Sequence, residues 1–210
     1  MTIDKDDLLN SILASISRID YIKSEDIPNI DLYMDQVTSF MEKALKSTKR
    51  YPDDKILTKT MINNYAKNDL LPPPVKKKYS KEHLLVLNFI YYFKSLLSIG
   101  DIEKLLAPIT EKYFQAEGNI NTTHIYDEVC AFDKERATVL QDDIKSAFEA
   151  SKNSFADASE EDKDLLQFFS FICMLSLDVY VKKLLIEKLI DTVAEDSSEE
   201  NQKEKAKKKK

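Results

Sequence analysis

Three consecutive prolines near the middle of the chain constrain its fold more than any other feature. Pro72-Pro73-Pro74 forces an extended turn, because proline lacks the N–H that a continuing helix needs and disfavours helix in the preceding residue. A helix pattern precedes this bend, from Thr58 as the N-cap to about Asn68. Its apolar residues at helical spacing predict a buried face of Met61, Ile62 and Tyr65.

The opposite face of this helix is polar, and a run of lysines follows the prolines. Asn, Thr and Lys side chains can hydrogen-bond base edges or phosphates. We therefore predict that both segments contact DNA. The predicted contact residues are Thr58, Lys59, Thr60, Asn63, Asn64, Lys67, Lys76, Lys77 and Lys78.

Two further helices are predicted beyond the lysine run. Ser80 caps the first, and Ser98-Ile99-Gly100-Asp101 has the spacing of a capping box that opens the second. The apolar residues of the first at helical spacing are Leu84, Leu87, Ile90 and Tyr91. Only two glycines in 210 residues, 32% charged residues and few turn signals indicate an all-α protein.

The net charge of −6 is distributed unevenly along the chain. Between Lys43 and His83 there are eleven basic and four acidic residues, a local charge of +7, so the remainder carries −13. A concentrated basic segment can bind nucleic acid even in an acidic protein. On charge alone a solvated lysine-rich surface explains this segment equally well, and what favours DNA is its coincidence with a recognition-helix pattern, described next.

This order of elements resembles the winged helix-turn-helix of the MerR family of bacterial transcription regulators. There a recognition helix reads roughly T-I-R-Y-Y-E-R-x-G-L-L, a wing with a basic residue two before a tyrosine follows, and a long helix leads to an L-x-x-I-x-x-L-L segment. Residues 61–71, 77–79 and 99–106 take these places here. The resemblance implies DNA binding and adds Tyr79, at the end of the wing, to the predicted contact residues.

A closer resemblance is to a bacterial family known as domain-of-unknown-function family 1836, itself MerR-like. It is carried by LTKTMINNY, LLPPP and KKYSKEHL, and it covers residues 27–109. The chain departs from the MerR pattern at Asn63, where an arginine is usual, and at Asp69, where a turn glycine is usual. The wing has also lost its glycine and arginine. A short wing of lysines favours backbone contact over base reading, because lysine is a point charge and not a bidentate fork.

Amphipathic helices are predicted on both sides of this region. An N-terminal helix spans about residues 4–20, and Asp31 is the expected N-cap of a helix to about Lys46. The inward residues of the second helix are Met34, Val37, Phe40, Met41, Ala44 and Leu45. It would be the first helix of the motif, with a connection over residues 47–57 that is longer than the usual three- or four-residue turn.

The C-terminal half is also expected to be helical. Pro108 suits a helix start, a long helix is predicted over residues 122–150, and Ser159-Glu160-Glu161-Asp162 opens a last helix to about Val193. Residues 165–180 are apolar nearly all round but too short for a membrane span, so we expect burial in a bundle or dimer. Residues 195–210 carry no apolar face and are expected to be disordered.

These patterns predict four regions. They are an N-terminal helix and linker over residues 1–26, a MerR-like winged helix-turn-helix over 27–109, a helical dimerisation or effector region over 110–193, and a charged tail over 194–210.

Enzymatic motifs are missing, since the chain has no P-loop, no glycine-rich nucleotide fingerprint and no His-Glu-x-x-His. We therefore predict neither an enzyme nor a cofactor. His124 with Asp127 and Glu128 is only a weak metal pattern. Cys130 and Cys173 lack the paired spacing of metal ligands. Two distant cysteines and an acidic N-terminus without a secretory signal favour the cytoplasm.

The sequence thus predicts a cytoplasmic, homodimeric regulator of transcription that binds double-stranded DNA, with an unidentified effector and no membrane contact. The rival hypothesis is a non-enzymatic adaptor that keeps a degenerate helix-turn-helix and binds another protein through its apolar helices. Salt separates the two, because a loss of binding that scales with the number of contacted phosphates is expected only for DNA.

Overall fold

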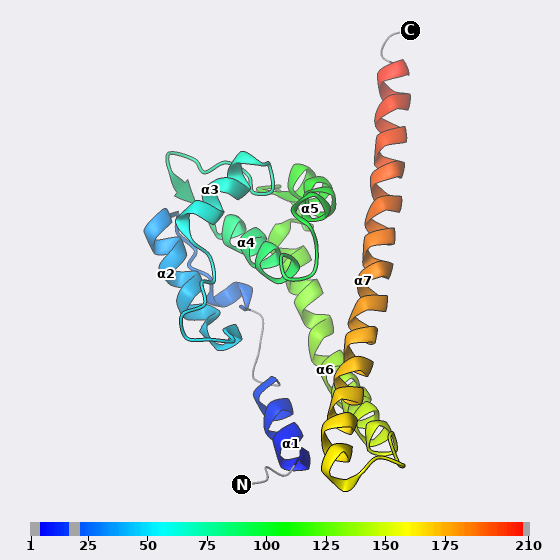
Figure 1. The fold of residues 1–210 in the computed structure, drawn as a ribbon. Coiled ribbons are helices and arrows are strands. Elements are labelled where there is room, and N and C mark those ends of the chain that lie inside the picture. Colours follow the sequence, from blue (N-terminus) through cyan, green and yellow to red (C-terminus); the bar gives the residue numbers. More distant parts are fainter. Residues whose placement is uncertain (1–4, 17–21, 208–210) are drawn as a thin grey trace. The chain divides into compact units, whose positions relative to one another are not determined.

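The computed structural model describes residues 5–16 and 22–207, and it divides the chain into two compact units, residues 1–132 and 133–210 (Figure 1). The boundary falls inside a single helix, α6 (Thr122–Lys152). The described part is mostly helical, as the sequence predicts, with two short strands in the first unit.

The first unit holds nearly all of the shorter elements. In chain order they are α1 (Lys5–Ile16), the 3-10 turn η1 (Ser24–Asp26), β1 (Leu32–Tyr33), α2 (Met34–Ala44), the 3-10 turn η2 (Lys46–Thr48), α3 (Lys59–Lys67), β2 (Lys78–Tyr79), α4 (Lys81–Phe93), α5 (Ile99–Tyr113) and the start of α6. β1 and β2 are antiparallel, with Leu32 opposite Tyr79 and Tyr33 opposite Lys78.

Helix α4 forms the centre of the first unit. Every residue from His83 to Ile90 is buried, which requires neighbours on all sides of the helix. One polar chain crosses this core: Asn88 Nδ2 donates to the Tyr126 hydroxyl of α6, which donates in turn to the Ile22 carbonyl at 2.6 Å. Burial raises the pKa of Tyr126, so the phenol stays neutral and links α6, α4 and the segment before η1.

Most predicted helix starts in this unit are confirmed. Thr58 caps α3, with its Oγ1 accepting from the Met61 N–H at 3.2 Å. Ser80 caps α4, and Ser98 caps α5 through the Asp101 N–H at 3.1 Å. Each start combines a hydroxyl with an apolar helical pattern, so the signal is local and readable from sequence.

Two predicted starts are wrong. Asp31 does not cap α2, because Leu32 and Tyr33 are taken up by the pairing with β2 and the helix begins at Met34 with Tyr33 as its N-cap. Pro108 does not open a helix either but lies inside α5. Of the side chains predicted to point inward on α2, Val37, Met41 and Leu45 are buried, Met34 and Phe40 are half-buried, and Ala44 is exposed.

The predicted N-terminal helix is confirmed over its described part. α1 covers Lys5–Ile16 with Leu9 and Leu13 buried, and residues 17–20 of the predicted helix lie outside the described residues.

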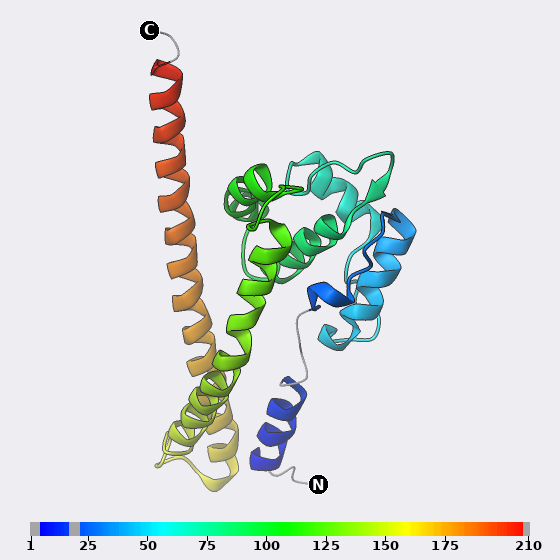
Figure 2. The same cartoon turned by 180° about the vertical axis from the view of Figure 1, so that it is seen from behind.

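The second unit is a helical hairpin of α6 and α7 (Glu160–Lys207), joined by the turn at residues 153–159 (Figure 2). Ser159 caps α7 as predicted, with its Oγ accepting from the Asp162 N–H at 3.2 Å. Phe148 of α6 packs edge-on against Phe171 of α7, with 5.2 Å between ring centroids. The Gln167 amide closes the turn by donating to the Lys152 carbonyl at 2.7 Å.

Helix α7 continues well beyond the predicted end near Val193, through Lys207. Residues 195–207, expected to be disordered, are therefore helical. Their composition explains this, because Glu, Lys, Gln and Ala are strong helix formers even without an apolar face to bury. None of the helices in the described ranges has both the length and the apolar content that crossing a membrane would require.

Candidate nucleic-acid interface

Helix α3 separates a buried face from a polar one. Ile62 and Tyr65 are buried and Met61 is half-buried, close to the predicted face. The polar side chains on the other side are all exposed, and they are Lys59, Thr60, Asn63, Asn64 and Lys67. Thr58 is half-buried and its hydroxyl is used as the cap, so its role is to start the helix.

Several of these exposed groups have no partner in the described part of the chain. Lys59 forms an ion pair with Asp35 of α2. Asn63, Asn64 and Lys67, in contrast, make no side-chain hydrogen bond or ion pair among the described residues. Only the Asn64 carbonyl is engaged, by the amide of Asn68 at the helix end, at 2.9 Å. Two amides and one cation are thus free to bind a ligand.

The lysine run folds into a very tight hairpin. The Val75 N–H donates to the Lys78 carbonyl at 3.1 Å, and the Lys78 N–H donates back at 2.9 Å. The two residues between them, Lys76 and Lys77, have φ of 51° and 64°. Positive φ at both central positions defines a type I′ turn, which normally takes Asn-Gly. Both lysines are exposed at its tip.

Both central residues of this turn have a strained backbone. A residue with a Cβ loses about 1–2 kcal/mol of stability in the left-handed conformation. Residues strained in this way are found more often at functional sites than elsewhere. Lys76 and Lys77 take part in no ion pair among the described residues. The hairpin therefore presents two uncompensated positive charges.

Lys78 and Tyr79, which follow the turn, contact other residues of the fold. Lys78 is half-buried and its Nζ lies 5.2 Å from the centroid of the Tyr33 ring, in cation–π geometry. Tyr79, predicted as a contact residue, is instead buried at 3% exposure. It lies opposite Leu32 in the sheet, and its ring meets His83 edge-on at 5.4 Å. Tyr79 thus anchors the base of the hairpin and is not available to a ligand.

His83 supports the hairpin from behind. Its Nδ1 accepts from the Ser80 N–H at 2.9 Å, which completes a capping box at the start of α4. The ring lies between Tyr79 and Phe114, 4.8 Å from the latter. Burial lowers the pKa of His83, against smaller raising effects from the Pro73 and Pro72 backbone and from Asp31. The imidazole is therefore held neutral.

These parts belong to one packed cluster. α2 contacts α3 and both strands, and α4 contacts β2. In both ribbon views α3 and β2 lie at the same end of the first unit (Figures 1 and 2). The fold thus presents an exposed polar helix and a lysine hairpin from neighbouring elements.

The connection between α2 and α3 is long but packed. It contains η2 and buries Ile56 and Leu57. The ammonium of Lys94, the C-cap of α4, donates to the Ile56 carbonyl at 2.7 Å, and Thr48 of η2 bonds Tyr91 of α4. The long connection is therefore itself fixed against α4 and its C-terminal end.

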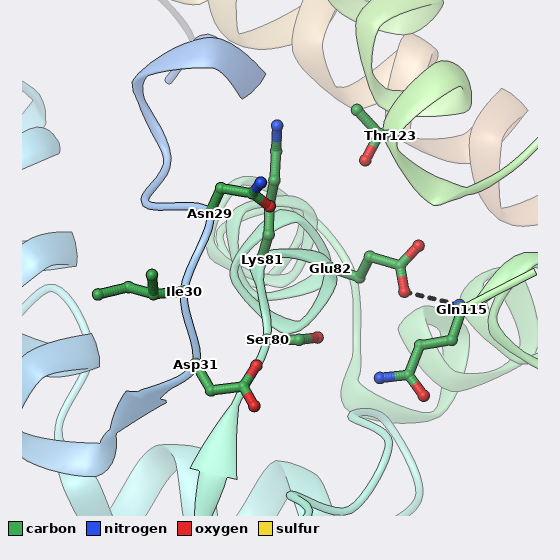
Figure 3. A pocket seen from close by; sticks show the side chains of 8 residues that line it. All are labelled: Asn29, Ile30, Asp31, Ser80, Lys81, Glu82, Gln115 and Thr123. Carbon is green, nitrogen blue, oxygen red and sulfur yellow. Dashed lines mark hydrogen bonds between the residues drawn. The ribbon is translucent and has the colours of Figure 1, made fainter.

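A separate open hollow of about 310 Å³ lies at the start of α4 (Figure 3). It is lined by Asn29, Ile30, Asp31, Ser80, Lys81, Glu82, Gln115 and Thr123. Glu82 Oε2 accepts from the Gln115 N–H at 2.6 Å, and burial raises the pKa of Glu82 against the opposing effect of that bond. With two carboxylates and one ammonium, the hollow is poorly suited to a phosphate and is distinct from the α3 face.

Sequence reasoning missed the role of His83, although Ser80-x-x-His83 has the capping-box spacing. It also missed the I′ turn, for which two lysines give no local signal. His124, Asp127 and Glu128 are exposed on α6, and within the described ranges no three His, Cys, Asp or Glu side chains come together as metal ligands would.

Comparison with known proteins places the chain in a family. A family model described as Domain of unknown function (DUF1836) matches residues 22–129. The chain belongs to this family, as the resemblance of its central motifs implies. No curated protein and no solved structure matches it.

Proposed function

We propose that the chain is a DNA-binding transcriptional regulator in which α2, α3 and the Val75–Lys78 hairpin act as a MerR-like winged helix-turn-helix. α3 would enter the major groove, and the lysines of the hairpin would hold flanking phosphates. The observation that carries the proposal is the pairing of an exposed, unpartnered Asn63-Asn64-Lys67 face with two unpaired lysines at the strained tip of the hairpin, all within the described part of the chain.

The dimensions and chemistry of α3 suit the groove. An α-helix with its side chains is about 10–12 Å in diameter, and the major groove, about 12 Å wide, admits a helix. Asparagine can bond the N6 and N7 edge of adenine with both amide atoms. Asn63 and Asn64 are exposed and can do so without disturbing the core, because the buried side of α3 is formed by Ile62 and Tyr65.

The hairpin suits phosphate contact and not base reading. Lys76 and Lys77 present single ammonium groups, which bind phosphate as point charges without sequence preference. The flanking basic residues Lys43, Lys46 and Lys55 are also exposed in this unit and add to a positive field that would attract DNA.

Salt-dependent binding tests the proposal. Affinity for fragments selected from genomic DNA should fall steeply with salt, and Lys76→Ala/Lys77→Ala/Lys78→Ala should flatten the slope by about one unit per lost phosphate contact. Weakening should be similar for all sequences, because phosphate contacts carry no sequence information.

The matched control removes three exposed lysines elsewhere. Lys112→Ala/Lys145→Ala/Lys182→Ala gives the same change in net charge away from the hairpin, and its salt slope should equal that of the parent protein. If both triple variants flatten the salt slope equally, the loss of net charge explains the change, and the hairpin lysines make no specific phosphate contacts. If the parent protein shows no salt-dependent DNA binding, the adaptor hypothesis takes over.

A further inference from the structure

One side of α7 carries a stripe of six large apolar side chains that the rest of the second unit leaves exposed. Other exposed apolar residues of α7 lie outside this stripe, and they are Val179, Val181, Leu185, Leu189 and Val193. The stripe consists of Leu165, Phe169, Ile172, Leu177, Tyr180 and Leu184. Their exposed fractions run from 39% to 71%. At 100° per residue these positions fall within an arc of about 140°, and they span about 29 Å of the helix.

The opposite side of α7 packs within the second unit near the turn, whereas Leu185 and Leu189 farther along that side remain exposed. Phe171 is 6% exposed against Phe148 of α6, and Gln167 bonds the turn backbone. Both residues lie on the reverse side of the helix from the centre of the stripe. The stripe therefore points away from the hairpin partner α6, and a different surface must cover it.

The exposed area is that of a dimer interface. Six side chains of this size, about half exposed, present roughly 700 Å² of mainly apolar surface. The largest apolar patch on a typical monomer is about 300–600 Å², whereas one partner in a stable complex buries about 800 Å². An exposed apolar stripe of this size calls for a partner of equal length.

The positions of the stripe identify the partner as a second copy. Leu165 and Leu184 lie equally far from the midpoint between residues 174 and 175, and the same holds for Phe169 with Tyr180 and for Ile172 with Leu177. A two-fold axis through that midpoint would place each member against its mate on an antiparallel copy, which is the self-complementarity that an isologous interface requires.

The residues at the centre and the ends fit the same arrangement. Cys173 and Ser176, also exposed and symmetric about the midpoint, are small side chains at the point where the two helices would approach most closely. At the ends, Glu161 of one copy would face Lys188 of the other. Neither takes part in an ion pair among the described residues, and opposite charges at this position fix register.

We propose that two copies of this chain associate through the α7 stripe as an antiparallel two-fold pair centred between Met174 and Leu175. This inference stands on the second unit alone and does not depend on DNA binding by the first. It extends the sequence-based expectation of a dimer by naming the face, the direction and the register.

Equilibrium sedimentation of the full chain tests the face. The parent protein should have twice the mass of one chain at micromolar concentration, and Leu177→Lys should raise the dimer dissociation constant by at least about 100-fold, because each substitution acts twice in an isologous interface. Leu189→Lys is the matched control. Leu189 is 57% exposed, close to the 61% of Leu177, but lies on the reverse side of the helix, so this variant should remain dimeric.

The circular dichroism spectra of both variants should match that of the parent protein. A lower sedimentation mass would then report dissociation of the dimer and not unfolding. A parent protein that sediments as a monomer would overturn the proposal. So would dissociation by Leu189→Lys with a dimeric Leu177→Lys, because the interface would then lie on the other side.

Disulfide formation tests the direction and register. In a background with Cys130 and Cys173 replaced by alanine, Leu165→Cys/Leu184→Cys should cross-link two copies under mild oxidation. Each single cysteine should fail to do so, because the two positions lie about 29 Å apart along one helix and meet only between antiparallel copies. Cross-linking by the single variants would indicate a parallel pair and overturn the register.

Discussion

His83 shows how much of the candidate interface rests on one buried side chain. It caps α4 through Nδ1 and fills the space between Tyr79 and Phe114. Its Nε2 makes no hydrogen bond of ordinary geometry within the described part of the chain. A neutral ring suits this site, whereas an imidazolium would place a charge where water cannot reach it.

The stability of the fold should therefore fall as the pH is lowered. Burial places the pKa of folded His83 below its unfolded value of about 6.5, so the unfolded chain binds more protons between the two values. The melting temperature should drop as the pH falls below about 6.5 towards the folded pKa. His83→Gln keeps a capping-box residue and removes the titration, so this variant should lose part of the pH dependence while being less stable at pH 7.5.

The control for this prediction is His124→Gln, since His124 is exposed on α6. That variant should keep the full pH dependence of the parent protein in thermal melts at pH 5.5 and 7.5. If the melting temperature of His83→Gln depends on pH as strongly as that of the parent protein, carboxylates elsewhere cause the loss of stability in acid.

Among the elements, the Val75–Lys78 hairpin is the one in which the residues that favour folding differ from those that would favour DNA binding. A type I′ turn prefers Asn-Gly, yet lysines occupy both left-handed positions. Lys76→Asn/Lys77→Gly should stabilise the protein by about 1–2 kcal/mol in denaturant unfolding. The same variant should weaken DNA binding and flatten the salt slope by up to about two units, because two phosphate contacts are lost.

A charge-preserving variant separates the two effects. Lys76→Arg/Lys77→Arg keeps both the charges and the strained backbone, so its stability and salt slope should stay near those of the parent. If Lys76→Asn/Lys77→Gly unfolds at lower denaturant than the parent, the lysines stabilise the turn and strain is no sign of function there.

The elements that could be predicted from the sequence are those whose signal is local. Thr58, Ser80, Ser98 and Ser159 each combine a capping hydroxyl with an apolar helical pattern, and all four start a helix in the structure. Asp31 has the same local signal, but its neighbours pair with a strand far along the chain. Long-range pairing overrides local preference, and periodicity in a single stretch does not show it.

The residues of the candidate site also differ in whether local sequence signals predict their positions. The polar face of α3 follows from helical spacing, and its exposed residues lie where the sequence places them. The burial of Tyr79 follows from the sheet and from His83, neither of which the sequence makes visible. Residues 165–180 are predicted to be buried in a bundle or a dimer, and the second unit alone leaves many of them exposed. Apolar periodicity shows that a face needs a partner but not whether that partner belongs to the same chain.

At the scale of the whole molecule, the two proposals make a joint prediction. A pair of chains joined through α7 would carry two α3 helices, so a DNA with two inverted half-sites could be held at both ends. The second contact would then be intramolecular, which raises the overall affinity by about 10²–10⁴-fold over a single half-site. Leu177→Lys should remove this gain and leave affinity for an isolated half-site unchanged.

Binding of the parent, Leu177→Lys and Leu189→Lys to single and double half-sites would measure this coupling. Leu189→Lys should bind both DNAs as the parent does, since it alters α7 outside the stripe. Equal affinity of the parent for single and double sites would show that the two chains of a dimer do not engage DNA together, even if each chain binds DNA and the dimer forms. A loss on the single half-site in Leu177→Lys would instead show that α7 acts on the first unit directly, because one half-site needs only one α3 helix.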